Sequence, residues 1–294
     1  MTASAPTAAD HLVDASELPP LRHLRHRAEI PMLVMAGVAT VVAIVVFLTL
    51  IALNVDQPGW LTTAVFLVVA GPLLAGVIFI RYSYWSTIGN GVEVTPHQLP
   101  QLYELFADLG ARLGMTPEGE GLLKLPRLYV TNGQGQFNAY ATKCRIRRGY
   151  VVIYSDLLDI AYFNGDFSTI RFVLGHELGH IHCGHVSIWR TTLRPVTRLL
   201  LIGQSVSRAQ EYSADRVGSL LAPEGALGMV GLFSGKHIST HIDIDAYFDS
   251  VADHGDGFWL KVANFRADHA LGFRRMTALR RVQDEGWDVH GQML

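Results

Sequence analysis

Two long apolar runs near the start of the chain dominate its pattern of hydrophobic and polar residues. Residues 31–55 and 57–80 carry no charged side chain, and Asp56 alone separates them. A helix needs about 20 residues to cross the hydrocarbon core of a bilayer, so each run is long enough. The NVDQPG sequence between them is typical of a turn. The pattern predicts two transmembrane helices, at about 31–54 and 60–80, that form a hairpin.

Basic residues beside the runs predict their orientation. Arg22, Arg25 and Arg27 precede the first run, Arg81 follows the second, and the turn contains no Lys or Arg. Because Lys and Arg concentrate in cytoplasmic segments, we expect both flanks to be cytoplasmic, at a plasma or inner membrane. Residues 1–30 would then be a flexible cytoplasmic tail.

Two alternatives to the membrane hairpin fit the lengths less well. A buried helical hairpin of a soluble protein seldom has such long uncharged runs. A cleaved signal peptide has an apolar core of only about 7–15 residues, and here thirty residues come before the first run.

The rest of the chain, residues 81–294, has the pattern of one α+β domain of ordinary size. Apolar residues at helical spacing predict a helix that starts at Thr95-Pro96 and ends at Gly114. Short β-rich segments and two later helical segments complete the pattern: strands at 127–131, 137–142 and 150–154, and helices from Asp166 or Ser168 to about 185 and from about 205 to 221.

Composition agrees with an apolar block joined to a soluble domain. The 294 residues are 49% hydrophobic but only 17% charged, with a mean hydropathy of +0.24. A net charge of −2 argues against nucleic-acid binding. Two cysteines cannot form a disulfide framework, and unpaired thiols suit a reducing compartment. Four of the 13 histidines fall within residues 176–185.

Those histidines include an HExxH motif. His176 and His180 are four residues apart, so on a helix both imidazoles lie on one face and can bind the same metal ion. Glu177, beside the first histidine, would then take a proton from a metal-bound water and pass it to the leaving amine of a peptide. The motif predicts hydrolysis of peptide bonds without a covalent intermediate.

A second helix offers the remaining groups. Glu211 and Asp215 also lie four residues apart, on a face that includes the small residues Ala214 and Gly218. Small residues let two helices approach closely. Two histidines and Glu211 would leave one zinc position open, as in catalytic zinc sites. Asp215 would accept a hydrogen bond from the outer nitrogen of a ligand histidine and fix its orientation.

Together these motifs resemble a known family. HELGHIxxxH, EYSADRVG and NAYA, behind an N-terminal apolar hairpin, are similar to the integral-membrane zinc metallopeptidases, which comprise HtpX heat-shock proteases and CAAX prenyl proteases. The resemblance covers roughly residues 85–285. It implies a zincin-like (gluzincin) catalytic domain, mostly helical with a small sheet. It also implies one Zn²⁺ per chain, bound by His176, His180 and Glu211, with Glu177 as general base.

The resemblance extends to further residues. It implies an edge strand that binds substrate backbone at Asn138, Ala139, Tyr140 and Ala141. His269 and Arg275 match a histidine and an arginine six residues apart that would stabilise the oxyanion or hold substrate, although the family's proline after the histidine is Ala270 here. HtpX-type relatives often carry two more membrane helices after HExxH, which this sequence lacks. His185 also matches a family position, and we assign it a structural role.

We therefore expect a membrane-anchored zinc endopeptidase that cleaves protein or peptide substrates at the cytoplasmic face, in quality control or processing of membrane proteins. The alternative is an inactive scaffold with a zinc-stabilised fold. The expected partners are substrates and the bilayer, with no nucleic acid, and the sequence leaves the oligomeric state open. Arg190, Arg194 and Arg198 recur every four residues, either on a solvated helix face or along lipid head groups.

Overall fold

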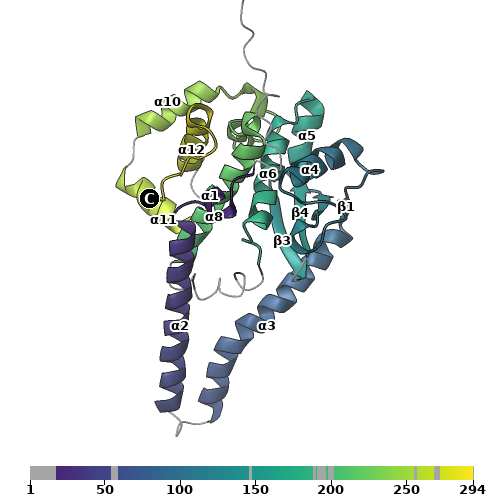
Figure 1. Cartoon of the computed structure of the whole chain (residues 1–294). Coiled ribbons are helices and arrows are strands. Elements are labelled where there is room, and N and C mark those ends of the chain that lie inside the picture. The colour runs from purple at the N-terminus through teal and green to yellow at the C-terminus, as the bar shows by residue number, and fades with distance from the viewer. Residues whose placement is uncertain are drawn as a thin grey trace, which may run out of the picture.

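Two long helices extend from one side of a folded body in the computed structural model of the chain (Figure 1). The structure describes residues 18–53, 59–145, 148–187, 190, 197, 202–254, 257–267 and 272–293. After the short helix α1 (Leu21–Leu24), the two long helices are α2 (Glu29–Leu53) and α3 (Gly59–Gly89).

Helix α2 is the one helix, among the residues that the structure describes, that is long and apolar enough to cross a membrane. Only 12% of its most apolar stretch is buried against the rest of the chain. Helix α3 is longer, but most of its side chains between residues 61 and 75 lie outside the described part, as does the expected turn at 54–58. The predicted two-helix membrane hairpin is therefore not established by the fold.

The described strands form a four-stranded sheet in the order β1-β2-β4-β3. Strand β2 runs parallel to β4, and β1 and β3 are antiparallel to their neighbours. Strand β3 lies at one edge of the sheet. The strands are β1 (Gly91–Glu93), β2 (Arg127–Thr131), β3 (Ala139–Arg145) and β4 (Arg148–Tyr154).

Helices surround the sheet and fill the remainder of the body, which confirms the α+β class. In Figure 1, helices α4 and α5 lie beside the sheet, α6 and α8 lie at the centre of the body, and α10 to α12 lie across the body from the sheet. The α-helices are α4 (Pro100–Arg112), α5 (Ser155–Asn164), α6 (Ser168–His182), α8 (Gly203–Leu221), α9 (Met229–Leu232), α10 (Ile244–His254), α11 (Phe258–Arg266) and α12 (Gly272–Glu285).

Helices α6 and α8 pack very closely because small residues face each other at their crossing. A Cβ atom added at Gly179 would lie 2.9 Å from the Cβ of Val217 and 3.3 Å from the Cα of Ala214. A Cβ added at Gly218 would lie 3.3 Å from the backbone nitrogen of His176. The face predicted to be small on the second helix therefore lies directly against the HExxH helix.

Two sequence predictions are wrong in their details. The first helix of the domain begins at Pro100 rather than at Pro96, because residues 95–98 form a tight turn in which Thr95 and Gln98 exchange backbone hydrogen bonds. Residues 21–29 are not a flexible tail: Leu24 and Glu29 are both 0% exposed, and Leu24 belongs to the main hydrophobic core. The folded body thus includes residues before the apolar block.

The close helix crossing makes Gly179 intolerant of a side chain. We expect Gly179→Ala to lower the free energy of unfolding by about 1–3 kcal/mol, because the added methyl group overpacks the contact with α8. The measurement is the thermal unfolding midpoint of the full chain in detergent. Gly89→Ala is the control, since a Cβ there meets nothing within 4 Å. Equal midpoints for both variants would contradict this account of the crossing.

Candidate metal centre and active site

Helix α6 brings the HExxH side chains to the centre of the body. His176 and Glu177 are buried, and His180 is partly exposed one turn later. The Nε2 atoms of the two histidines lie 3.1 Å apart, so both rings point at the same position. The helical spacing predicted from the sequence therefore gives the expected convergence.

Helix α8 completes the group of ligand atoms. Glu211 is buried beside both rings, with Oε2 at 3.5 Å from His176 Nε2 and Oε1 at 3.4 Å from His180 Nε2. Ligand atoms of the three residues all lie within 4.8 Å of one another. The structure thus brings together His176, His180 and Glu211, which lie on two different helices.

This group fits a tetrahedral metal ion. Zinc bonds of about 2.0–2.1 Å to nitrogen and oxygen at tetrahedral angles place neighbouring ligand atoms about 3.3 Å apart. The three separations of 3.1, 3.4 and 3.5 Å bracket that value. Two imidazoles and a carboxylate also match the donor set of catalytic zinc sites. The chemistry and spacing of the donors therefore fit a divalent metal ion.

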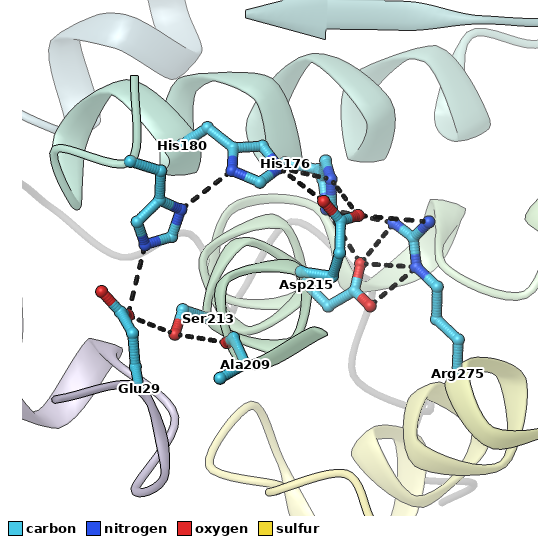
Figure 2. A network of polar contacts seen from close by, with 9 residues as sticks. Glu29, His176, His180, Ala209, Ser213, Asp215 and Arg275 are labelled. Atoms are coloured by element: carbon cyan, nitrogen blue, oxygen red, sulfur yellow. Dashed lines mark hydrogen bonds and ion pairs between the residues drawn. The ribbon is translucent and has the colours of Figure 1, made fainter. Parts of the chain in front are cut away.

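Asp215 contacts His176 on the side of the ring away from the metal position. Its Oδ1 lies 2.9 Å from His176 Nδ1, which leaves Nε2 free to face the metal position (Figure 2). Such a carboxylate fixes the ring orientation and makes the imidazole a stronger ligand.

Arg275 of α12 holds Asp215 in turn. Its Nε and Nη2 atoms donate to the carboxylate at 2.8 and 2.6 Å, while Nη1 lies 3.9 Å from Glu211 Oε2 and Nη2 lies 3.1 Å from His176 Nδ1. This guanidinium compensates buried negative charge behind the ligands, and it also lines the site cavity. Its predicted partner His269 lies outside the described residues, so the structure does not place that pair.

A cavity of about 810 Å³ opens onto the ligand group. Glu177 lines it together with His176 and His180, so its carboxylate shares the cavity with the metal position. Leu33 of α2 and Phe79 of α3 line the same cavity. The space in front of the candidate metal centre therefore continues to the bases of the two long helices.

The segment predicted to bind substrate borders this cavity. Asn138, Ala139, Tyr140 and Ala141 all line it, and the last three belong to the edge strand β3. The Tyr140 hydroxyl lies 3.1 Å from Thr87 Oγ1 on α3. The position at a sheet edge agrees with the geometry that strand addition requires, and the binding role remains a prediction.

The sequence analysis missed a second support, which reaches the other histidine. His180 Nδ1 lies 2.8 Å from Nδ1 of the buried His185, and His185 Nε2 lies 3.2 Å from Oε2 of Glu29. Burial lowers the pKa of His185 to about 4, so this imidazole is neutral at physiological pH. The signals were a histidine five residues after His180 and a lone acid next to an apolar run, and neither pattern by itself indicates a contact.

The basic residues after the motif need a correction. Arg190 is buried, and its Nη1 lies 3.2 Å from Glu29 Oε1, so it belongs neither to a solvated face nor to a lipid-facing stripe. Arg194 and Arg198 lie outside the described residues. A buried carboxylate requires compensating charge nearby, which explains why this arginine turns inward.

We expect metal binding to strengthen as pH rises toward 9. Burial and the charge of Arg275 lower the pKa of His176, but hydrogen bonds to Asp215 and Glu211 outweigh them and raise it to about 9. A protonated imidazole cannot bind metal, so the apparent Zn²⁺ affinity should increase about tenfold per pH unit between about pH 7 and pH 9. Competition with a chromophoric chelator measures it. Asp215→Asn should flatten the profile, whereas a flat profile in the parent protein would contradict the prediction.

Comparisons with known proteins agree with the site. Residues 101–205 match peptidase family M48, a range that includes HExxH on α6 and ends before Glu211. The chain is 23% identical over 203 residues to the plastoglobule-localized metallopeptidase 48 of Arabidopsis thaliana, covering 63% of this chain and 55% of that protein. It is 26% identical over 188 residues to a protease HtpX homolog of Pseudarthrobacter chlorophenolicus, covering 50% and 61%.

A protease HtpX homolog of Ralstonia nicotianae is 25% identical over 214 residues, covering 54% of this chain and 70% of that protein. The chain thus spans between 55% and 70% of the length of these relatives. No solved structure gives a significant match. The resemblance predicted from the motifs is confirmed: residues 101–205 are similar to peptidase family M48, and the chain is similar to HtpX protease homologs.

Proposed function

We propose that this protein is a membrane-anchored zinc endopeptidase, with a gluzincin active site built from His176, His180 and Glu211. The observation that carries the proposal is the convergence of these three side chains, from two helices, at distances that suit a tetrahedral ion. The M48 match supports a metal-dependent protease. Zinc is the ion that this donor set favours, with one ion per chain.

The residues around the ion have separate roles. A bound zinc ion would supply an activated water and polarise the peptide carbonyl. Glu177, which shares the cavity, would serve as the base that accepts a proton from the attacking water and delivers it to the leaving amine. Asp215, held by Arg275, keeps His176 in the tautomer that presents Nε2. Arg275 thus acts through Asp215, and because it also lines the cavity it keeps its predicted role of holding substrate.

The substrate would bind as an added strand along β3. This strand lies at the edge of the sheet and lines the cavity beside Glu177, so its backbone groups are placed to pair with an extended peptide. Backbone pairing gives affinity with little sequence preference, which suits cleavage of many protein substrates. Quality control or processing of membrane proteins is the role that the HtpX resemblance favours.

The membrane anchor would consist of α2 and α3. Helix α2 exposes a broad face of large apolar side chains along most of its length, and residues of this kind are stable in that arrangement only in lipid or against a partner. They include Val34, Val38, Val41, Val42, Val45 and Leu48. With Arg81 and the N-terminal arginines in the cytoplasm, the catalytic part of residues 81–294 would act at the cytoplasmic face.

The rival function is a zinc-stabilised scaffold without catalysis. A scaffold needs the metal ligands but has no use for a general base in an accessible cavity. Glu177 lines the cavity instead of pairing with a structural partner among the described residues, and this favours the enzyme.

Replacement of the general base separates the two functions. We expect Glu177→Gln to retain stoichiometric zinc but to lose at least about 100-fold in cleavage of an unfolded protein substrate, because the amide cannot accept the proton. Cleavage is followed by gel and zinc by elemental analysis. Glu224→Gln, at an exposed position outside the cavity, is the control. Zinc without cleavage in the parent protein would instead favour the scaffold.

The orientation has its own test. We expect a reporter fused directly after Arg81 to show cytoplasmic activity, and a reporter placed in the turn at residues 54–58 to show activity on the opposite side. Paired enzymatic reporters that are active in one compartment each make the measurement. A reporter after Arg81 that is active only outside the cytoplasm would overturn the proposed topology.

A further inference from the structure

A buried carboxylate from the start of the apolar anchor lies behind the candidate metal centre. Glu29 is the first residue of α2 and is 0% exposed. Its Oε2 accepts a hydrogen bond from Ser213 Oγ on α8 at 2.7 Å, and its Oε1 lies 3.3 Å from Arg25 Nη1. Arg190 pairs with the same oxygen. Ser213, Arg25 and Arg190 therefore hold Glu29 in place, and Figure 2 shows its contact with Ser213.

The fixed carboxylate connects to a metal ligand through one residue. Glu29 Oε2 lies 3.2 Å from His185 Nε2, and His185 Nδ1 lies 2.8 Å from His180 Nδ1. His180 Nε2 faces the metal position, so its Nδ1 must carry the ring proton and donate it to His185. His185 then has its own proton on Nε2, where it faces the carboxylate. The link from His180 to His185 is an aligned hydrogen bond, whereas His185 Nε2 meets Glu29 Oε2 at an ion-pair distance without hydrogen-bond alignment.

We propose that Glu29 and His185 are positioning residues for the metal centre, a relay that holds His180 in the orientation and tautomer that bind the ion. The relay is the counterpart of Asp215 behind His176. Here, however, the carboxylate comes from the anchor helix, 151 positions earlier in the sequence than His180. The inference rests on the proposed metallopeptidase function, since it concerns the same metal.

One consequence is that the contacts behind the metal centre involve the segment where α2 joins the folded body. The backbone nitrogen of His26 donates to Ser213 Oγ at 2.8 Å, and Ser213 in turn donates to Glu29. The segment that begins the anchor is therefore bonded to the helix that carries Glu211. Displacement of α2 would break the support of His180 without touching any metal ligand.

The first test measures metal binding rather than the rate of substrate cleavage. The full chain in detergent is loaded with Zn²⁺ in competition with a chelator, and with Co²⁺ for its visible absorption spectrum. We expect Glu29→Gln and His185→Leu each to weaken Zn²⁺ binding by about tenfold or more and to alter the Co²⁺ spectrum, because loss of such outer partners typically costs 10–100-fold in affinity. Asp156→Asn, a buried carboxylate on α5 away from the ligands, should leave both unchanged.

A double-mutant cycle distinguishes a relay from two separate structural effects. If Glu29 acts through His185, the variant with both substitutions binds Zn²⁺ no more weakly than His185→Leu alone. Effects that multiply would overturn the relay, as would parental affinity and spectrum in both single variants. His185→Leu leaves the pairs of Glu29 with Arg25 and Arg190 intact, so it tests the link even if Glu29→Gln folds poorly.

The outcome is also separable from the proposed function. A parent protein that binds zinc and cleaves substrate, with variants of unchanged affinity, would refute the relay and leave the peptidase standing. A parent protein that binds no stoichiometric metal would refute the proposed function itself.

Discussion

The close approach of α6 and α8 is the constraint on which the rest of the structure depends. Glycines at 175, 179 and 218, with Ala214, remove the side chains that would otherwise keep the two backbones apart. Only at this separation can a carboxylate from α8 reach two imidazoles on α6 at 3.4–3.5 Å. The convergence of the metal ligands therefore depends on helix packing as much as on which residues they are.

A second constraint is electrostatic, because the crossing buries several charged groups that each need compensation. Arg275 compensates the charge of Asp215 on the side of His176. On the side of His180, Arg25 and Arg190 compensate the charge of Glu29. Asp215 lies beside the ligand His176, and Glu29 lies beside His185, which contacts the ligand His180. Charge compensation and orientation of the ligand rings therefore come from the same contacts. The arginines come from α12, from the segment before α2 and from the segment after α6, which ties distant parts of the chain to one site.

The cavity extends from this site to the ends of α2 and α3 that join the folded body. It is lined by the ligands and Glu177, by the edge strand β3, and by residues at the bases of α2 and α3. Under the proposed function, an extended peptide paired with β3 would lie beside Glu177 in this cavity.

The sequence by itself determined the local features. Helical spacing predicted HExxH and ExxxD on single faces, a short β-rich segment predicted β2 at its observed bounds, and the uncharged runs predicted the long helices, because each depends on neighbours a few residues apart. Contacts between distant segments could not be read in this way. The tertiary structure alone placed Glu29 and His185 behind His180, turned Arg190 inward and packed residues 21–29 into the core. A buried charge is stabilised by whichever partner the fold brings near it, and that choice is made in space rather than along the chain.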